Sequence, residues 1–159
     1  MAMHTWFECK IRYEKVMENG MQKKVTEPYL VDALSFTEAE ARIIEEMTPF
    51  ISGEFTVSDI KRANYSELFP SDEESADRWF KCKLIFITLD EKSGAEKKTS
   101  TQVLVQAADL RDAVKKLDEG MKGTMADYQI GMVSETPLMD VYPYSAGPND
   151  KPEFAPSKA

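Results

Sequence analysis

Two short stretches of this chain have almost the same amino-acid sequence, and this repetition constrains the fold more than any other feature. The first stretch is WFECKIRY, from Trp6 to Tyr13, and the second is WFKCKLIF, from Trp79 to Phe86. The chain has two tryptophans and two cysteines, and each stretch contains one of each. Repeats are the first thing to look for in a sequence, because they decide which fold is assembled. The match indicates a chain built from two related parts.

The correspondence continues beyond these stretches at a nearly constant spacing. Residue numbers differ by 73 at the start, by 74 after a one-residue insertion, and by 73 again where ELFP meets DVYP. A colinear series of this length is not expected by chance, so we predict an internal duplication. The predicted divisions are a first unit at residues 5–70, an acidic and solvated linker at 71–78, a second unit at 79–143 and a flexible tail rich in Pro, Gly and Ser at 144–159.

Each unit begins with a predicted β-hairpin. Apolar and polar residues alternate in both opening stretches, which is typical of a half-buried strand, with Phe and Cys on the inward side and Trp and Lys on the other. Asn19-Gly20 in the first unit and Ser93-Gly94 in the second favour tight hairpins. The second strand of the first hairpin contains Pro28, which predicts an edge strand or a bulge.

A helix and a third strand complete each predicted unit. In the first unit, Ser35 and Glu38 form a capping box, and Leu34 is placed to pack on Ala39 as a hydrophobic staple. The corresponding helix of the second unit begins at Asp109. Each unit is therefore predicted to be ββαβ, and the fold class is α+β.

The two predicted units need each other for stability. A ββαβ unit of this size covers one sheet face with its helix and leaves the other face bare, and so small a unit is marginally stable alone. We therefore predict a pseudo-two-fold dimer with two helices, built from two mainly antiparallel sheets or from one shared sheet.

Composition excludes several classes of function. The net charge is −8, which disfavours a surface that attracts phosphate backbones everywhere. The chain has no apolar run long enough to span a membrane and no recognisable leader, so we expect a cytoplasmic protein. With one histidine, His4, and with Cys9 and Cys82 expected to be reduced core thiols, we predict no metal, no cofactor and no catalytic residues.

Aromatic and cationic side chains share the predicted sheet face opposite the helices. Such a face can hold single-stranded nucleic acid, although matched tryptophans are more economically explained as contacts between the two copies. The doublet Lys61-Arg62 aligns with Ser134-Glu135 in the second unit. This difference in charge makes the doublet a further candidate binding site. The candidate binding residues are Trp6, Lys10, Arg12, Lys61, Arg62, Trp79, Lys81 and Lys83.

The wording of the chain resembles that of a known family, domain of unknown function 4494. The resemblance is carried by WFECKIRYEKVMENGMQKKVTEPYLVDALSFTEAEARIIEE and by the later RWFKCKL and MDVYPY, and it covers nearly the whole chain. It implies an origin in Bacteroidetes or in their phages and mobile elements, and hence an accessory role there. The family has no assigned activity, so the resemblance transfers no functional residue.

Three functions remain open at this point. The first is a small non-catalytic protein that binds a protein partner, or another copy of itself, through a sheet face or edge. The second is a nucleic-acid-associated accessory protein that uses the aromatic and basic face, which the net charge of −8 disfavours. The third is a small-ligand or enzymatic cleft between the two units.

Overall fold

The computed structural model describes residues 5–124 and 127–143, which form two compact units. The predicted tail at 144–159 and His4 lie outside these described residues. The described chain contains two helices and two mixed four-stranded sheets, so the predicted α+β class is confirmed. Neither helix is long and apolar enough to cross a membrane.

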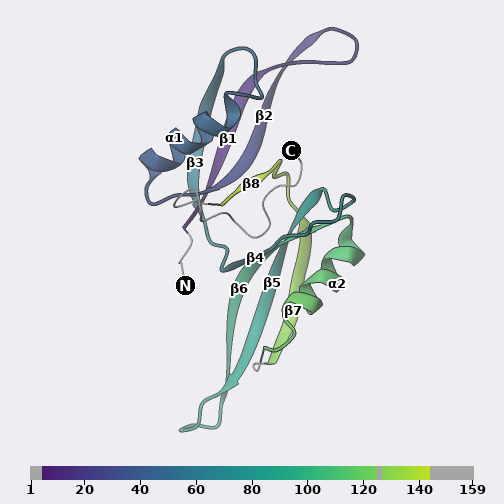
Figure 1. Cartoon of the computed structure of the whole chain (residues 1–159). Helices are drawn as coiled ribbons and strands as arrows, with labels where there is room; N and C mark the ends of the chain where they lie inside the picture. The colour runs from purple at the N-terminus through teal and green to yellow at the C-terminus, as the bar shows by residue number, and fades with distance from the viewer. Residues whose placement is uncertain (1–4, 125–126, 144–159) are drawn as a thin grey trace. The chain divides into compact units, whose positions relative to one another are not determined.

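The first unit contains one sheet with the strand order β3-β1-β2-β8, and its helix lies against one face of that sheet (Figure 1). The long hairpin of β1 and β2 extends beyond the helix (Figure 1). The elements are β1 (Trp6–Val16), β2 (Gln22–Asp32), α1 (Phe36–Met47), β3 (Phe55–Ala63) and β8 (Val141–Tyr142).

The second unit has the same arrangement, with the strand order β4-β6-β5-β7 and one covering helix (Figure 1). Read from the other edge, this order places corresponding strands at corresponding positions of the two sheets. The elements are β4 (Glu67–Phe69), β5 (Arg78–Leu89), β6 (Glu96–Ala107), α2 (Leu110–Gly120) and β7 (Asp127–Glu135).

The short strands β4 and β8 lie where the contiguous ββαβ pattern does not place them. β4 follows β3 in the sequence but pairs in parallel with β6, and β8 follows β7 but pairs in parallel with β2. The described parts of the compact units are consequently residues 5–64 with 137–143, and residues 65–124 with 127–136. Each sheet is completed by the strand that follows the third strand of the other unit. The boundaries drawn from the sequence, and the duplication itself, stay predictions.

A separate apolar core lies between each sheet and its helix. The alternation predicted for the two opening stretches is confirmed, because their Phe and Cys residues belong to these cores. Full burial of a large apolar side chain contributes about 1.5–3 kcal/mol, so these two clusters dominate the stability of their units. The first core contains Phe7, Cys9, Ile11, Val31, Ala33, Ala39, Ile43 and Met47. The second contains Phe80, Cys82, Leu84, Val103, Val105, Ala107, Ala113, Leu117 and Met121.

Both hairpins turn at the glycines that the sequence indicates, but neither loop is a two-residue turn. In the first hairpin, the N–H of Gly20 donates to the carbonyl of Met17 at 2.9 Å, and the N–H of Met17 donates to the carbonyl of Met21 at 2.8 Å. Gly20 has φ +83 and Gly94 has φ +73, which is the left-handed region that favours glycine. The loops are longer than predicted because each glycine ends a turn instead of forming its centre.

The helix caps follow the sequence, but the predicted staple is wrong. Ser35 Oγ accepts a hydrogen bond from the N–H of Glu38 at 3.1 Å, and a Glu38 carboxylate oxygen accepts from the N–H of Leu34 at 2.6 Å. Leu34 is 79% exposed, whereas Ala39 is fully buried, so the two side chains do not form a staple. Phe36 instead packs edge-on against Phe7, with ring centroids 4.9 Å apart.

The irregularities of the sheets lie in the third strands and not at Pro28. β2 lies between β1 and β8, and its register with β1 is unbroken, so the predicted edge or bulge is wrong. The carbonyl of Pro28 points away from β1 and accepts the N–H of Met139 at 2.9 Å. A residue's N and O point to the same side of a strand, so the missing N–H removes no bond from the β1–β2 ladder. The bulges fall at Ser58 in β3 and at Gly131 in β7.

Residues 72–75, 77 and 78 of the predicted linker are exposed, but two of its positions make closer contacts with the protein. Ala76 is 3% exposed. The Lys116 ammonium of α2 donates to Ser71 Oγ at 3.1 Å and to a Glu73 carboxylate oxygen at 2.7 Å. These contacts hold the beginning of the linker against the second unit.

Candidate functional site

The structure buries the two tryptophans of the predicted binding face. Trp6 in β1 and Trp79 in β5 are each 3% exposed. Stacking on a nucleic-acid base requires an accessible ring, because the base must lie flat against it. The indoles are therefore parts of the packed protein and leave no ring face for a base.

The cations of the predicted face are dispersed over two sheets and are partly opposed by acids. In the register of β1 with β3, Lys10 faces Asp59, and Lys61 faces Glu8. This alternation of charge differs from the continuous basic groove that follows a phosphate backbone. Of the candidate cations, Arg12, Lys61, Arg62 are exposed, and Lys10, Lys81, Lys83 are half-buried.

The two cysteines are buried and free. Burial raises the pKa of the Cys9 thiol to about 12, and the nearby negative charges of Glu8, Asp59 and Glu40 add to this effect. Burial also raises the pKa of the Cys82 thiol to about 11. A nucleophilic cysteine needs an accessible thiolate, so neither thiol is suited to covalent chemistry.

A polar cluster lies on the helix side of the first sheet. Tyr13 and Tyr29 donate hydrogen bonds to the same carboxylate oxygen of Glu27, at 2.9 and 3.4 Å. The Lys15 ammonium lies 3.7 Å from the other oxygen. Tyr142 of β8 stacks on Tyr29, with ring centroids 6.1 Å apart. Burial raises the pKa of both Tyr29 and Tyr142 above the ordinary value of 10.0, so these phenols stay protonated.

The second unit has less polar residues at the positions of this cluster. Phe86, Thr101, Val103 and Phe69 stand where the first unit has Tyr13, Glu27, Tyr29 and Tyr142. A polar cluster in one unit alone is a candidate ligand site. However, among the described residues no buried side-chain nitrogen or oxygen lacks a hydrogen-bond partner. The phenols of Tyr13 and Tyr29 and the carboxylate of Glu27 satisfy one another, so the cluster is explained by packing.

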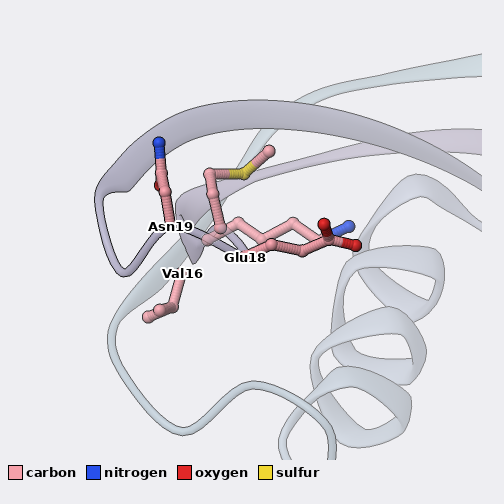
Figure 2. Close-up of a pocket in the computed structure, with 5 residues that line it drawn as sticks. Val16, Glu18 and Asn19 are labelled. Atoms are coloured by element: carbon pink, nitrogen blue, oxygen red, sulfur yellow. The ribbon is translucent and has the colours of Figure 1, made fainter.

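The tip of the β1–β2 hairpin presents apolar side chains to solvent. Val16, Met17 and Met21 are 64%, 38% and 66% exposed. Asn19 shapes the turn, because its side-chain oxygen accepts the N–H of Met21 at 3.0 Å. An open hollow at this tip is lined by Lys15, Val16, Met17, Glu18 and Asn19, and Val16 and Asn19 point to opposite sides of the loop (Figure 2).

The tip of the β5–β6 hairpin has a different character. Leu89 at its base is 69% exposed, but the loop that follows is polar and has the sequence DEKSGA. Asp90 accepts the backbone N–H of Lys92 at 3.0 Å, which is the usual chemistry of a solvated turn. Equivalent hairpins thus carry an apolar tip in the first unit and a polar tip in the second.

The family assignment follows from the sequence as a whole. A family profile described as "Domain of unknown function (DUF4494)" matches residues 5–144, which is most of the chain. The chain belongs to the DUF4494 family. Comparisons with curated proteins and with solved structures gave no match. Membership in DUF4494 therefore places the chain among relatives without assigning an activity.

The hairpin tip is a site that the sequence analysis missed. The stretch VMENGM was read only as a turn, because Asn19-Gly20 is so strong a turn signal. The available signal was the pair of methionines that flanks the turn, where the second unit has Asp90 and Ala95. Among the described residues, no group of three or more His, Cys, Asp or Glu side chains is placed to hold a metal ion.

Proposed function

We propose that this chain is a small non-catalytic binding protein that docks on another protein through the tip of the β1–β2 hairpin. The observation that carries the proposal is the exposure of Val16, Met17 and Met21 at that tip, where Val16 and Met17 also line the hollow. Clustered exposed apolar side chains mark interaction sites in soluble proteins. Methionine is enriched at such surfaces because its flexible thioether adapts to a partner.

The charges around the tip are of both signs. Lys15 and Lys23 lie directly opposite each other in the register of β1 with β2, and Lys24 is the next residue of β2. Lys15 already has an acidic neighbour, because its ammonium lies 3.7 Å from a Glu27 carboxylate oxygen, and Lys24 faces Glu14 across the same strand pair. The partner we propose is therefore defined by an apolar pocket that accepts the exposed side chains of the tip.

We also propose that the protein works in the cytoplasm. Free, buried thiols fit the reducing cytoplasm. An accessory role in a phage or mobile element of Bacteroidetes, which the family resemblance suggests, would suit a protein that works by binding. The nucleic-acid hypothesis has less support, because both tryptophans are buried.

Site-specific photo-cross-linking tests the proposal. A photoreactive amino acid is placed at Asn19 in the full chain, and the matched control carries it at Ser93 on the polar tip of the other hairpin. We expect position 19 to cross-link one protein in cells that produce the chain, and position 93 to give no such product. The product should be at least about tenfold weaker after Met17→Ser with Met21→Ser, since loss of two buried apolar contacts costs more than about 1.4 kcal/mol.

The result at the control hairpin decides the interpretation. Leu89→Ser changes an exposed apolar residue of the second unit and should leave the cross-link unchanged. Equal products from positions 19 and 93, or a product that survives the double methionine change, would contradict docking through the first tip. A cross-link to nucleic acid instead of protein would revive the alternative function.

A further inference from the structure

Each sheet has a slot on the outer edge of one strand, and a short segment fills it. The slot of the first unit is the edge of β2, which β8 occupies. The slot of the second unit is the edge of β6, which β4 occupies. Both segments have the same pattern, an acidic residue followed by an aliphatic residue, an aromatic residue and proline: DVYP at 140–143 and ELFP at 67–70.

Backbone contacts in the two slots correspond one to one. In the first slot, Leu30 pairs with Val141, and the N–H of Met139 donates to the carbonyl of Pro28 at 2.9 Å. In the second slot, Leu104 pairs with Leu68, and the N–H of Ser66 donates to the carbonyl of Gln102 at 2.8 Å. The slots therefore bind their segments in the same register and in the same parallel direction.

Side chains in the two slots also correspond. The aromatic residue of each segment, Tyr142 or Phe69, packs against the core beneath the helix. Gly120 at the end of α2 makes room for Phe69, because a Cβ on it would lie 2.8 Å from the ring. The second slot thus has space for an aromatic ring at this position.

A cation on each helix holds the chain at the end of the segment or just after it. Arg42 of α1 donates to the carbonyl of Pro143 at 3.1 Å and also to the carbonyl of Asp32. Lys116, at the corresponding position of α2, donates to Ser71 Oγ at 3.1 Å. Each slot is therefore a peptide-binding site. It pairs with the segment's backbone, packs against its aromatic side chain and donates hydrogen bonds from a cation of the helix.

We infer that these slots accept the same segment from a second copy of the chain, giving a strand-exchanged dimer. This inference goes beyond the proposed function and uses a different surface. Both segments leave the unit that precedes them in the sequence, near residues 64–65 and 136–137, before they enter a slot. A segment from another copy can make the same contacts within the slot, and the chain on either side of the segment then spans the two copies. Reciprocal exchange closes a dimer, while one-way exchange extends into longer assemblies.

A disulfide between differently tagged full chains tests the inference. Ser66 Oγ and Thr101 Oγ are 3.0 Å apart across the second slot, which suits replacement by a cysteine pair. Ser66→Cys in one copy and Thr101→Cys in another are unfolded together, refolded and oxidised. We expect a disulfide between the copies that is at least tenfold more abundant after refolding at about 1 mM than at about 10 µM, because intramolecular filling dominates at low concentration.

Three controls make the result decisive. The double variant Ser66→Cys/Thr101→Cys should close its disulfide within one chain at about 10 µM. Ser66→Cys mixed with Ser93→Cys, which lies on the distant hairpin tip, measures collisional oxidation. The unsubstituted chain measures the contribution of Cys9 and Cys82. The inference is overturned if the mixture gives no more product than these controls at either concentration, or if the double variant forms no disulfide at all.

Discussion

At the scale of single residues, the two buried thiols make the stability of the folded chain depend on alkaline pH. An exposed cysteine releases its proton near pH 9.0, whereas burial raises the pKa of Cys9 to about 12. Between these values the unfolded chain binds fewer protons than the folded chain, so the free energy of unfolding falls as pH rises. The contribution is fully present below pH 9 and is lost as pH approaches 12.

This dependence can be measured by urea unfolding at about pH 8 and about pH 10.5. We expect the wild-type chain to lose stability over this interval, and Cys9 contributes up to about 1.4 kcal/mol for each pH unit above 9.0, the pKa of the exposed thiol. Cys9→Ala should be less stable at both pH values but should lose less between them. Tyr29 and Tyr142 act in the same direction and remain in the variant. An identical loss in the variant and the wild type would exclude Cys9 as a cause.

Local sequence signals predicted the role of single residues correctly where a side chain bonds to the backbone close to it in the sequence. Ser35 and Asp109 cap their helices as predicted, because each oxygen reaches an N–H three residues ahead. Leu34 failed as a staple because its side chain depends on tertiary contacts, which no local pattern specifies. The hairpin tip was missed for a related reason: exposure of Met17 and Met21 is a property of the folded surface.

At the scale of elements, the main surprise is the pairing of β4 and β8. The hairpins, helices and third strands could be predicted, because alternation, caps and turn glycines lie within about 40 consecutive residues. ELFP and DVYP were recognised as corresponding sequences, but a strand of three or two residues is too short to show a period. Nothing in a linear pattern states which of two similar edges such a segment joins. The strand partners therefore required the structure.

Packing of β4 on α2 predicts that Gly120→Ala destabilises the chain. Alanine is the better helix former, by at most about 1 kcal/mol and less at the last helical residue. Its Cβ would lie 2.8 Å from Cδ1 and 2.9 Å from Cε1 of Phe69, so the ring must move. We expect a net loss of about 1–3 kcal/mol in the free energy of unfolding, measured with urea.

Two further variants separate this clash from other effects of the glycine change. Gly53→Ala is the matched control, because a Cβ there meets no atom within 4 Å. Phe69→Leu in the Gly120→Ala background should recover part of the loss, because a smaller side chain relieves the contact. A Gly120→Ala chain as stable as the wild type would show that Phe69 does not lie over α2.

At the scale of the whole molecule, the central feature is the crossed pairing of two short strands within one chain: β4 pairs with β6, and β8 pairs with β2. Each unit would have an incomplete sheet without a segment that follows the other unit's third strand in the sequence. Neither predicted copy can therefore complete its own sheet as a contiguous fragment. The same property makes exchange between copies possible, since a slot does not distinguish the chain from which its segment comes.

Disulfide formation at two alternative positions tests the exchange most directly. In the dilute full chain, Ser66→Cys should close a disulfide with Thr101→Cys, because these hydroxyl oxygens are 3.0 Å apart. Without exchange, β4 would lie on β2, and residue 66 would instead face Glu27, the counterpart of Thr101. We therefore predict an intramolecular disulfide in Ser66→Cys/Thr101→Cys and none in Ser66→Cys/Glu27→Cys. The reverse result would contradict the strand exchange on which the account depends.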